Sequence, residues 1–406
     1  MDTQATLDGL SPMTDTQATF NELGIPPHLV ERLAGLSIQT PTKVQQEAIP
    51  PLCQGRSMVF QSETGTGKTL AYLLPLLQRI DGEVPQVQLL IVAPTHELAS
   101  QIKSQIQLVT DIPAVLLIGG VPIKRQVEML KKRPLIAVGG AARLMELVYL
   151  KKLKIHQVRS VVLDEADRLL SPELRDDTAA LCQALPPDVQ LVACSATVTG
   201  RTELLIQSML SHHSEDSVLE RRILPPEDIL QKKITHIAIY SERRDKVETL
   251  RKLLLAEMES STTGLPLKAI VFPSRPADVD VIRSKLDYKR LECSALHAKQ
   301  DKVRRKQTLD QFRKGGCPVL ITSDLAARGL DIPDVTHIIQ LDMPSNTDFF
   351  VHRAGRTGRN GRSGLNIVIG DAYEMRQLAA AEKRLKLIVY PKVLYRGRLV
   401  APDQED

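Results

Sequence analysis

The chain has 406 residues, of which 43% are hydrophobic and 25% are charged, and its formal net charge is +5. This length is typical of two domains, and the composition is that of a globular protein. No stretch approaches the ~18 apolar residues of a membrane span, so we expect a soluble protein that makes no membrane contact. The basic charge favours a polyanionic partner, although many proteins that bind no nucleic acid are equally basic.

The cysteine content, the N-terminal residues and the aromatic content argue against a zinc site, secretion and nucleic-acid binding by base stacking. The chain has five widely spaced cysteines and no C-x-x-C pair, which argues against a zinc site and is typical of a reducing compartment. The first nineteen residues contain no Lys or Arg and no apolar core, so a secretory signal is excluded and we expect a cytoplasmic protein. With 3% aromatic residues and no Trp, a bound nucleic acid would be held by its backbone rather than by stacking.

The first half of the chain predicts an α/β domain. Residues 1–19 carry the polar repeat DTQAT twice and are expected to form a mobile tail. Over residues 20–212, apolar runs alternate with helix-length amphipathic segments; the runs are SMVF, QLLIVAP, AVLLIG, PLIAVG, SVVLD and QLVACS. This alternation indicates a mostly parallel sheet that is flanked by helices.

The second half repeats the pattern after an interruption. Residues 213–229 are polar and contain a Pro-Pro pair, as an interdomain linker would. Residues 230–395 then contain the runs ITHIAIY, KAIVFP, PVLITS, VTHIIQL and LNIVIG, and residues 396–406 form a short tail. We therefore expect two tandem α/β domains, with ligands bound beyond the carboxyl ends of their strands.

A glycine-rich segment follows the SMVF run and opens an apolar helix-like segment. Glycines let backbone N–H groups curl around phosphates, Lys68 can reach the β- and γ-phosphates, and Thr69 can ligate Mg²⁺. The strict pattern begins with Gly where this chain has Ser62. The predicted ATP-binding residues of this segment are Ser62, Glu63, Thr64, Gly65, Thr66, Gly67, Lys68 and Thr69.

Two carboxylates follow the later run SVVL. Asp164 would orient Mg²⁺, and Glu165 would position and deprotonate the water that attacks ATP. An ordinary acidic helix start is the alternative. Because this pair lies downstream of a phosphate-binding loop, the two together predict a magnesium-dependent ATPase in which Lys68, Asp164 and Glu165 are catalytic.

These motifs resemble those of the DEAD-box helicases of superfamily two. The resemblance runs from Phe20 to about Gly364 and includes the tetrapeptide Asp164-Glu165-Ala166-Asp167. It implies two RecA-like domains and an RNA-dependent ATPase, that is, an ATP-dependent RNA helicase that uses ATP and Mg²⁺. Thr42, Gln45 and Phe20 resemble the family's adenine-reading element: the Gln45 amide can donate and accept, and the Phe20 ring can stack. For Phe20 alone, a core aromatic is an equally good interpretation.

The second half carries two further motifs of this family. The segments 322–324 and 328–331 match the fifth motif, which implies that Gly329 and Asp331 bind the nucleotide, with Asp331 at the ribose. The segment 352–359 matches the sixth motif, and Arg356 and Arg359 would stabilise charge on the γ-phosphoryl group as arginine fingers. A solvated basic patch is the alternative, although three glycines in HRAGRTGRNGR suit close approach to a ligand.

The resemblance also assigns coupling and RNA-binding residues. Coupling between the ATP site and the second domain would use Asp167, Ser195, Thr197 and His352. The predicted RNA contacts are Pro94, Thr95, Glu97, Gly119, Gly120, Arg143, Arg275, Arg305, Gly315 and Thr322. For Arg275 and Arg305, ordinary surface charge is an equally good interpretation. Most of these residues suit phosphate and 2′-hydroxyl contacts, so sequence-independent RNA binding is expected.

Three departures from the family pattern bear on RNA affinity. His96 stands where Arg is usual, Gly139-Gly140-Ala141-Ala142 replaces a Thr-Pro-Gly run before Arg143, and Lys302 stands where Gln is usual. We expect a monomer that unwinds duplexes locally and remodels RNA–protein complexes. An RNA clamp that only locks onto RNA, and a DNA helicase of the same superfamily, remain as alternatives. The sequence identifies no particular RNA or protein partner.

Overall fold

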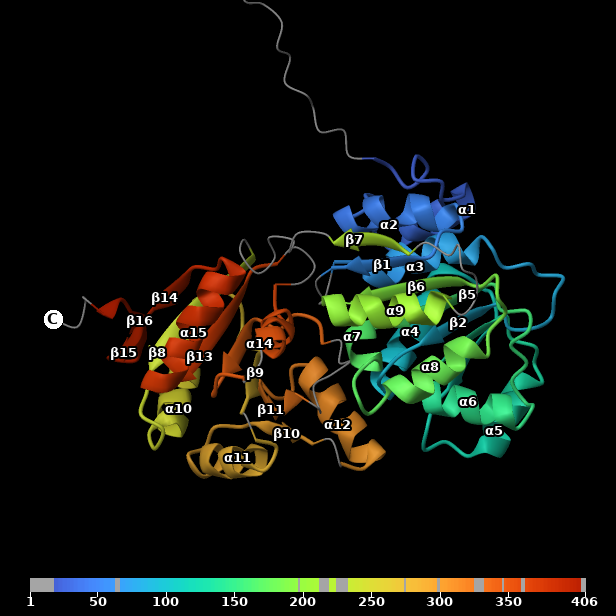
Figure 1. Cartoon of the computed structure of the whole chain (residues 1–406). Helices are drawn as coiled ribbons and strands as arrows, with labels where there is room; N and C mark the ends of the chain where they lie inside the picture. The colour runs from blue at the N-terminus through green and yellow to red at the C-terminus, as the bar shows by residue number, and fades with distance from the viewer. Residues whose placement is uncertain are drawn as a thin grey trace, which may run out of the picture.

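The computed structural model describes residues 18–62, 66–195, 198–211, 219–223, 233–273, 275–297, 300–324, 332–344, 347–358 and 362–402. Figure 1 shows two α/β domains side by side, each with a central sheet and flanking helices. The predicted fold class is confirmed: both sheets are parallel and have seven strands. Within the described residues, no helix is long and apolar enough to cross a membrane.

The first domain is built on one parallel sheet. Its strand order is β3 (Ala114–Leu117), β4 (Ile136–Gly139), β2 (Leu89–Val92), β5 (Ser160–Asp164), β6 (Gln190–Ser195), β1 (Met58–Gln61) and β7 (Glu220–Ile223). Its helices are α1 (Pro27–Gly35), α2 (Lys43–Cys53), α3 (Lys68–Leu77), α4 (His96–Val109), α5 (Ile123–Leu130), α6 (Ala141–Tyr149), α7 (Ala166–Leu169), α8 (Arg175–Gln183) and α9 (Gly200–Ser211). Alternate residues of β2 belong to two different core clusters. Leu89 and Ile91 belong to one cluster, and Leu90 and Val92 belong to the other. Both faces of the sheet are therefore buried, which explains why the strands read as continuous apolar runs.

The second domain has its own parallel sheet. The order is β10 (Ser294–Leu296), β11 (Val319–Thr322), β9 (Ala269–Phe272), β12 (His337–Gln340), β13 (Gly364–Gly370), β8 (Ile234–Tyr240) and β14 (Val389–Pro391). Its helices are α10 (Lys246–Glu259), α11 (Asp278–Tyr288), α12 (Lys302–Arg313), α14 (Thr347–Ala354) and α15 (Ala372–Leu385). Strands β15 (Val393–Tyr395) and β16 (Arg398–Val400) form a separate antiparallel hairpin.

Both sheets share one topology. Subtracting seven from each strand label of the second sheet turns its order into 3-4-2-5-6-1-7, which is the order of the first sheet. Because all strands are parallel, their carboxyl ends meet at one edge of each sheet. The two domains therefore offer equivalent positions for ligands at these edges.

Two of the predicted non-core segments contain strands of the structure. The linker predicted at 213–229 contains β7, whose residues Glu220–Ile223 pair with β1 and so belong to the first sheet. This Glu-Arg-Arg-Ile strand lies at a sheet edge, where polar side chains are tolerated, so it carries no apolar pattern. The tail predicted at 396–406 likewise contains β16. Residues 1–17 of the predicted N-terminal tail lie outside the described residues.

Candidate active site

The loop between β1 and α3 is held by its own polar groups. Lys68 Nζ donates to the Ser62 carbonyl at 2.8 Å, and the hydroxyls of Ser62 and Thr66 lie 2.6 Å apart. Gly67, the N-cap of α3, has φ +93°, and a Cβ there would lie 2.5 Å from Gln45 Nε2. Gly67 is thus required by both its backbone and its neighbour. The predicted binding residues Glu63, Thr64 and Gly65 lie outside the described residues.

The predicted adenine-reading residues lie at the start of α2, against this loop. Gln45 Oε1 accepts from the Thr42 backbone N–H at 2.9 Å, and its Nε2 donates to the Gly67 carbonyl at 3.2 Å. The buried Thr42 hydroxyl oxygen finds no hydrogen-bond partner within the described part of the chain. An unsatisfied polar atom beside a phosphate-binding loop fits a site for a polar ligand.

Phe20 lies in the core of the first domain. Its ring is 1% exposed and belongs to the same apolar cluster as Leu33 and Leu52. The structure thus places Phe20 as a core aromatic, the alternative interpretation of the sequence. Stacking of its ring on adenine stays a prediction that requires the ring to become exposed.

Asp164 ends β5 with hydrogen-bond donors on both carboxylate oxygens. Oδ2 accepts from the Tyr72 hydroxyl at 2.9 Å, and Oδ1 accepts from the Glu165 backbone N–H at 2.9 Å and from Cys194 Sγ at 3.2 Å. Burial raises the pKa values of Tyr72 and Cys194, and the nearby Asp164 charge raises them further. Both groups therefore remain protonated donors that fix the carboxylate.

Tyr72 and Cys194 are not among the site residues that the sequence predicts. Tyr72 stands within the apolar run of α3, and Cys194 within the apolar run of β6, so both read as core residues. The available signals were positional: Tyr72 follows Thr69 by three residues on one helix, and Cys194 immediately precedes Ser195. In the structure Cys194 pairs in register with Asp164 across β5 and β6.

Glu165 has an unusual backbone. Its φ of 52° lies in the left-handed region, and the residue is the N-cap of the short helix α7. For a residue other than Gly, such a conformation costs about 1–3 kcal/mol and is concentrated at functional sites. The backbone turns at Glu165, whereas Asp164 still belongs to β5. The two adjacent carboxylates can therefore serve different roles.

Two side-chain contacts join the domains near the carboxyl edge of the first sheet. His352 Nε2 of α14 lies 3.7 Å from Asp167 Oδ2 of α7, and Arg305 Nε of α12 lies 2.8 Å from Glu97 Oε1 of α4. The first pair unites two predicted coupling residues. Ser195, a third, is buried in the first domain, where its carbonyl accepts from the Ser62 N–H at 3.0 Å. Thr197, the fourth, lies outside the described residues.

Both halves of the chain match known family models. The model described as DEAD/DEAH box helicase matches residues 42–205, and that described as helicase conserved C-terminal domain matches residues 245–361. A DEAD-box ATP-dependent RNA helicase of Bacillus cereus, CshC, is 37% identical over 88% of this chain and 89% of its own length. The chain belongs to the DEAD-box family of ATP-dependent RNA helicases.

Solved structures give the same fold for this helicase. Dbp5 of S. cerevisiae bound to RNA and ADP BeF3 matches with a TM-score of 0.78 at 28% identity, covering 92% of this chain and 95% of that chain. A Dbp5 variant bound to Nup159, a Gle1 variant, IP6 and ADP matches with a lower TM-score of 0.64 at 27% identity, covering 91% and 96%. The whole helicase is thus more similar to the Dbp5 structure with RNA and ADP BeF3 than to the structure with ADP.

Several predicted RNA contacts lie at the carboxyl edges of the helicase sheets. Pro94 and Thr95 follow β2, Gly119 and Gly120 follow β3, Arg143 follows β4, Arg275 follows β9 and Thr322 ends β11. The structure does not bring Gly315 to them, because it precedes β11 at the opposite edge.

Some of these side chains are already engaged within the helicase. Glu97 and Arg305 pair with each other, as described above. Arg143 donates to the Val121 carbonyl at 2.8 Å and pairs with Glu146 at 2.9 Å. Thr322 is fully buried and donates to the Leu296 carbonyl at 3.3 Å. Arg275, with a side chain that is 69% exposed, remains accessible beside Asp278.

The sixth motif is anchored by an arginine without a predicted role. Arg353 is 2% exposed, and its guanidinium donates to both oxygens of Asp324 at 2.7 and 2.6 Å. This bidentate pair joins the sixth motif to the fifth. Arg356 is partly exposed just beyond it, whereas Arg359, Gly329 and Asp331 lie outside the described residues.

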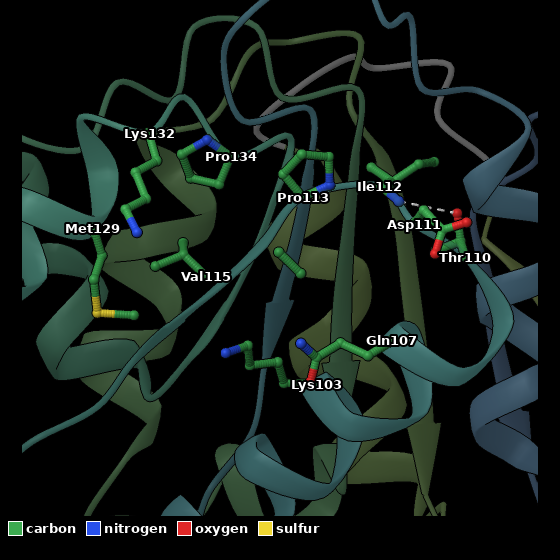
Figure 2. Close-up of a pocket in the computed structure, with 11 residues that line it drawn as sticks. Lys103, Gln107, Thr110, Asp111, Ile112, Pro113, Val115, Met129, Lys132 and Pro134 are labelled. Carbon is green, nitrogen blue, oxygen red and sulfur yellow. Dashed lines mark hydrogen bonds between the residues drawn. The ribbon is translucent and has the colours of Figure 1, made fainter.

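A hollow of about 410 Å³ lies at the amino edge of the first sheet, opposite the carboxyl edge that carries the phosphate-binding loop (Figure 2). It is lined by residues that precede or begin β3 and β4, including Pro113, Ala114 and Pro134. Ligands of parallel α/β sheets bind at the carboxyl edge. This hollow is therefore separate from the ATP site of the helicase.

Proposed function

We propose that this helicase hydrolyses ATP between its domains and couples hydrolysis to sequence-independent RNA binding, local duplex unwinding and RNA–protein remodelling. One observation carries the proposal: His352 of the sixth motif lies 3.7 Å from Asp167, within the tetrapeptide that begins at Asp164. The phosphate-binding loop and the sixth motif thereby belong to one site that both domains build. ATP binding and domain closure then depend on each other.

The chain also offers residues that fit Mg²⁺. The ion prefers oxygen ligands, keeps several waters and binds through one or two protein groups plus phosphates. Thr69 and Asp164 are the proposed protein ligands, and the described residues contain no cluster of three acidic, His or Cys ligands that would form a full cage. When bound, Mg²⁺ would neutralise charge on the β- and γ-phosphates. Tyr72 hydrogen-bonds to Asp164 and to the Thr69 side chain, so it bridges the two proposed ligands.

The remaining chemistry is assigned to side chains of both domains. Lys68 and the loop N–H groups hold the phosphates, and Glu165 accepts the proton of the attacking water. Arg356 and Arg359 stabilise charge on the γ-phosphoryl group from the second domain. The support for this division is that α14, which leads into Arg356, contacts the first domain through His352.

We expect Tyr72→Phe to weaken magnesium binding about 10–100-fold, the usual effect of losing a group that orients a metal ligand. The change leaves Asp164 Oδ2 without its 2.9 Å donor in a buried place. The measurement is binding of fluorescent ADP at increasing Mg²⁺ concentrations, which reports the magnesium midpoint without hydrolysis.

The matched control is Tyr149→Phe, because Tyr149 is 75% exposed in the same domain. ADP binding without Mg²⁺ should be the same in both variants and the wild type. Equal magnesium midpoints for Tyr72→Phe and wild type would rule out the bridging role of Tyr72.

The function as a whole is tested with RNA and a short duplex. We expect RNA to stimulate ATP hydrolysis, single-stranded DNA of the same sequence to compete poorly, and a short RNA duplex to separate only with ATP. ATP-dependent retention of RNA without strand separation would instead identify an RNA clamp. Equal stimulation by DNA would identify a DNA helicase.

We also propose a monomer in the cytoplasm. All five cysteines are free thiols, which supports a reducing compartment. Sedimentation of the full chain with RNA and an ATP analogue should give one protein per RNA-bound complex. A dimer would contradict the first part of this proposal.

A further inference from the structure

Helices α10 and α11 are neighbours in the second domain (Figure 1). Residues of both helices line two hollows. The larger, about 750 Å³, is lined by Arg275, Asp278 and Lys285 from the α11 side. The smaller, about 420 Å³, is also lined by Lys285 and continues past Tyr288 and Lys289. Val247 and Lys285 line both, so the two form one continuous groove, here called the α10–α11 groove.

The outer part of this groove is basic. Its charged lining residues are Arg244, Arg251, Lys285 and Lys289, against a single acidic residue, Glu248. Arg251 pairs with Glu248 at 2.6 Å. Arg244 has a side chain that is 86% exposed and pairs with its neighbour Asp245 at the longer distance of 3.4 Å. The charges of Arg251, Lys289 and Lys252 help to lower the Glu248 pKa, after the larger effect of its Arg251 hydrogen bond. Lys289, the C-cap of α11, lines the same hollow as Arg244 and Arg251, so these cations gather on one surface.

An aromatic ring stands at the outer end of the groove. Tyr288 is 84% exposed, so its ring is accessible to a ligand in the groove. Leu286 and Val247 provide a partly apolar floor beside it. An exposed ring beside cations suits a nucleobase that stacks while its phosphates meet the charges.

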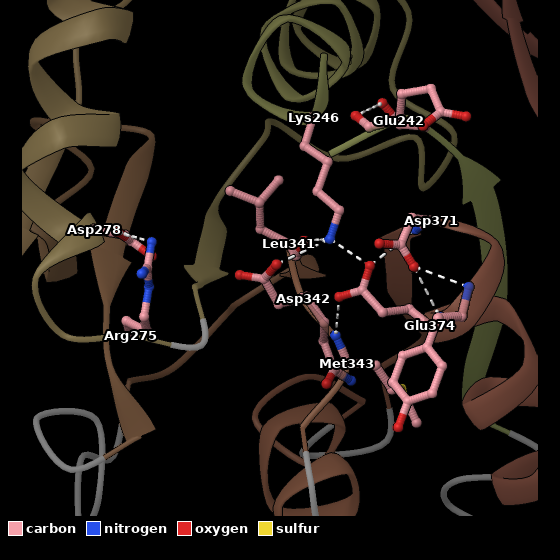
Figure 3. Close-up of polar contacts among 12 residues, drawn as sticks. Glu242, Lys246, Arg275, Asp278, Leu341, Asp342, Met343, Asp371 and Glu374 are labelled. Carbon is pink, nitrogen blue, oxygen red and sulfur yellow. Dashed lines mark hydrogen bonds and ion pairs between the residues drawn. The ribbon is translucent and has the colours of Figure 1, made fainter. Parts of the chain in front are cut away.

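The groove begins at a proposed RNA contact. Arg275 and Asp278 lie at the start of α11, at the carboxyl edge of the second sheet (Figure 3). Lys285 and Tyr288 follow along the same helix, which is eleven residues and therefore about 16 Å long. A strand that contacts Arg275 can continue along α11 without crossing the interior of the domain.

We propose that the α10–α11 groove is an accessory RNA-binding site, which holds the part of a single strand that extends beyond the core contacts at Arg275. Arg244, Lys285 and Lys289 contact its phosphates, and Tyr288 stacks on a base. This proposal rests on the proposed RNA function. The basic charge of the outer part of the groove and its continuity with Arg275 favour RNA over a protein segment as the occupant.

The test compares oligo(U) RNAs of about 8 and about 20 nucleotides, one within and one beyond the usual site sizes for single strands. Binding is measured by fluorescence anisotropy with the full chain and a non-hydrolysable ATP analogue. We expect the wild type to bind the longer RNA more tightly. Replacing Arg244, Lys285 and Lys289 together by Gln should remove this advantage and leave the short RNA unaffected.

Salt dependence makes the test quantitative. Each phosphate contact to a single strand contributes about 0.7 to the slope of log K against log salt, so three contacts contribute about 2. Between 50 and 200 mM salt, the wild-type affinity for the long RNA should therefore fall about 16-fold more than that of the triple variant. Tyr288→Ala should weaken long-RNA binding about tenfold, whereas Tyr288→Phe, which keeps the ring, should not.

A matched control replaces Lys131, Lys152 and Lys154 by Gln; these exposed lysines lie in turns before the amino ends of β4 and β5. Equal losses in the groove and control variants would overturn the proposal, as would wild-type affinity that does not increase with RNA length. If even the short RNA fails to bind the wild type, the proposed RNA function itself fails. The two failures are thereby distinguished.

Discussion

Replacing Glu165 by Gln should slow ATP hydrolysis about 10²–10⁴-fold, the usual contribution of a general base. The amide keeps the shape of the carboxylate but cannot accept the proton of the attacking water. The backbone at Glu165, with φ at 52°, should be unaffected because Gln tolerates it no worse. The measurement is phosphate release at saturating RNA and ATP.

Binding of ATP should survive this substitution. Lys68, Gln45 and Asp164 are unchanged, so the ATP-dependent affinity for RNA should match that of the wild type or exceed it, because the closed state persists. Glu128→Gln is a suitable control, since Glu128 lies on α5 and pairs with the exposed Lys131. Equal ATP turnover by Glu165→Gln and wild type would end the assignment of Glu165 as the base.

Replacing Lys246 by Met should destabilise the second domain by about 3–5 kcal/mol, the usual cost of breaking a buried ion pair. Lys246 has a side chain that is 5% exposed and donates to Glu374 at 2.5 Å, Asp342 at 2.9 Å and the Leu341 carbonyl at 2.9 Å (Figure 3). Met fills the space but leaves two carboxylates close together without a cation. Thermal unfolding should show a midpoint that is lower by on the order of 10 °C.

Two further variants separate charge from packing. Arg244→Met removes an exposed cation two residues away and should change the unfolding midpoint little. The double variant Lys246→Met with Glu374→Gln should recover part of the lost stability, because one of the stranded charges is gone. A single Lys246→Met variant as stable as the wild type would show that the three groups do not stabilise the domain together.

The parallel sheets and the phosphate-binding loop were predictable because their signals are local. A strand that is buried on both faces is an apolar run wherever it lies. Gly67 is favoured by its own positive φ, and Gln45 also lies close to it in space. The edge strand β7 escaped prediction for the opposite reason. Its side chains are polar, and only its pairing with β1 makes it a strand.

The polar contacts that complete the site were not predictable in this way. Tyr72 and Cys194 lie within apolar runs, and their role follows from the distance between α3, β5 and β6 rather than from either segment alone. The pairing of Glu97 with Arg305 likewise depends on how two domains meet. The resemblance to the family predicts that both residues contact RNA. RNA that binds there must therefore compete with the ion pair between Glu97 and Arg305.

Each domain places a lysine first in the helix that follows its first strand, Lys68 in α3 and Lys246 in α10. Because the two sheets share one strand order, these lysines occupy equivalent positions, but their contacts differ. Among the described residues, the Lys68 ammonium group donates to the Ser62 carbonyl, whereas that of Lys246 pairs with Asp342 and Glu374. In the second domain, two carboxylates thus pair with the lysine that is equivalent to Lys68. Nucleotide titration should therefore reach one ATP per chain without cooperativity, and each unwinding event should consume a single ATP per closure.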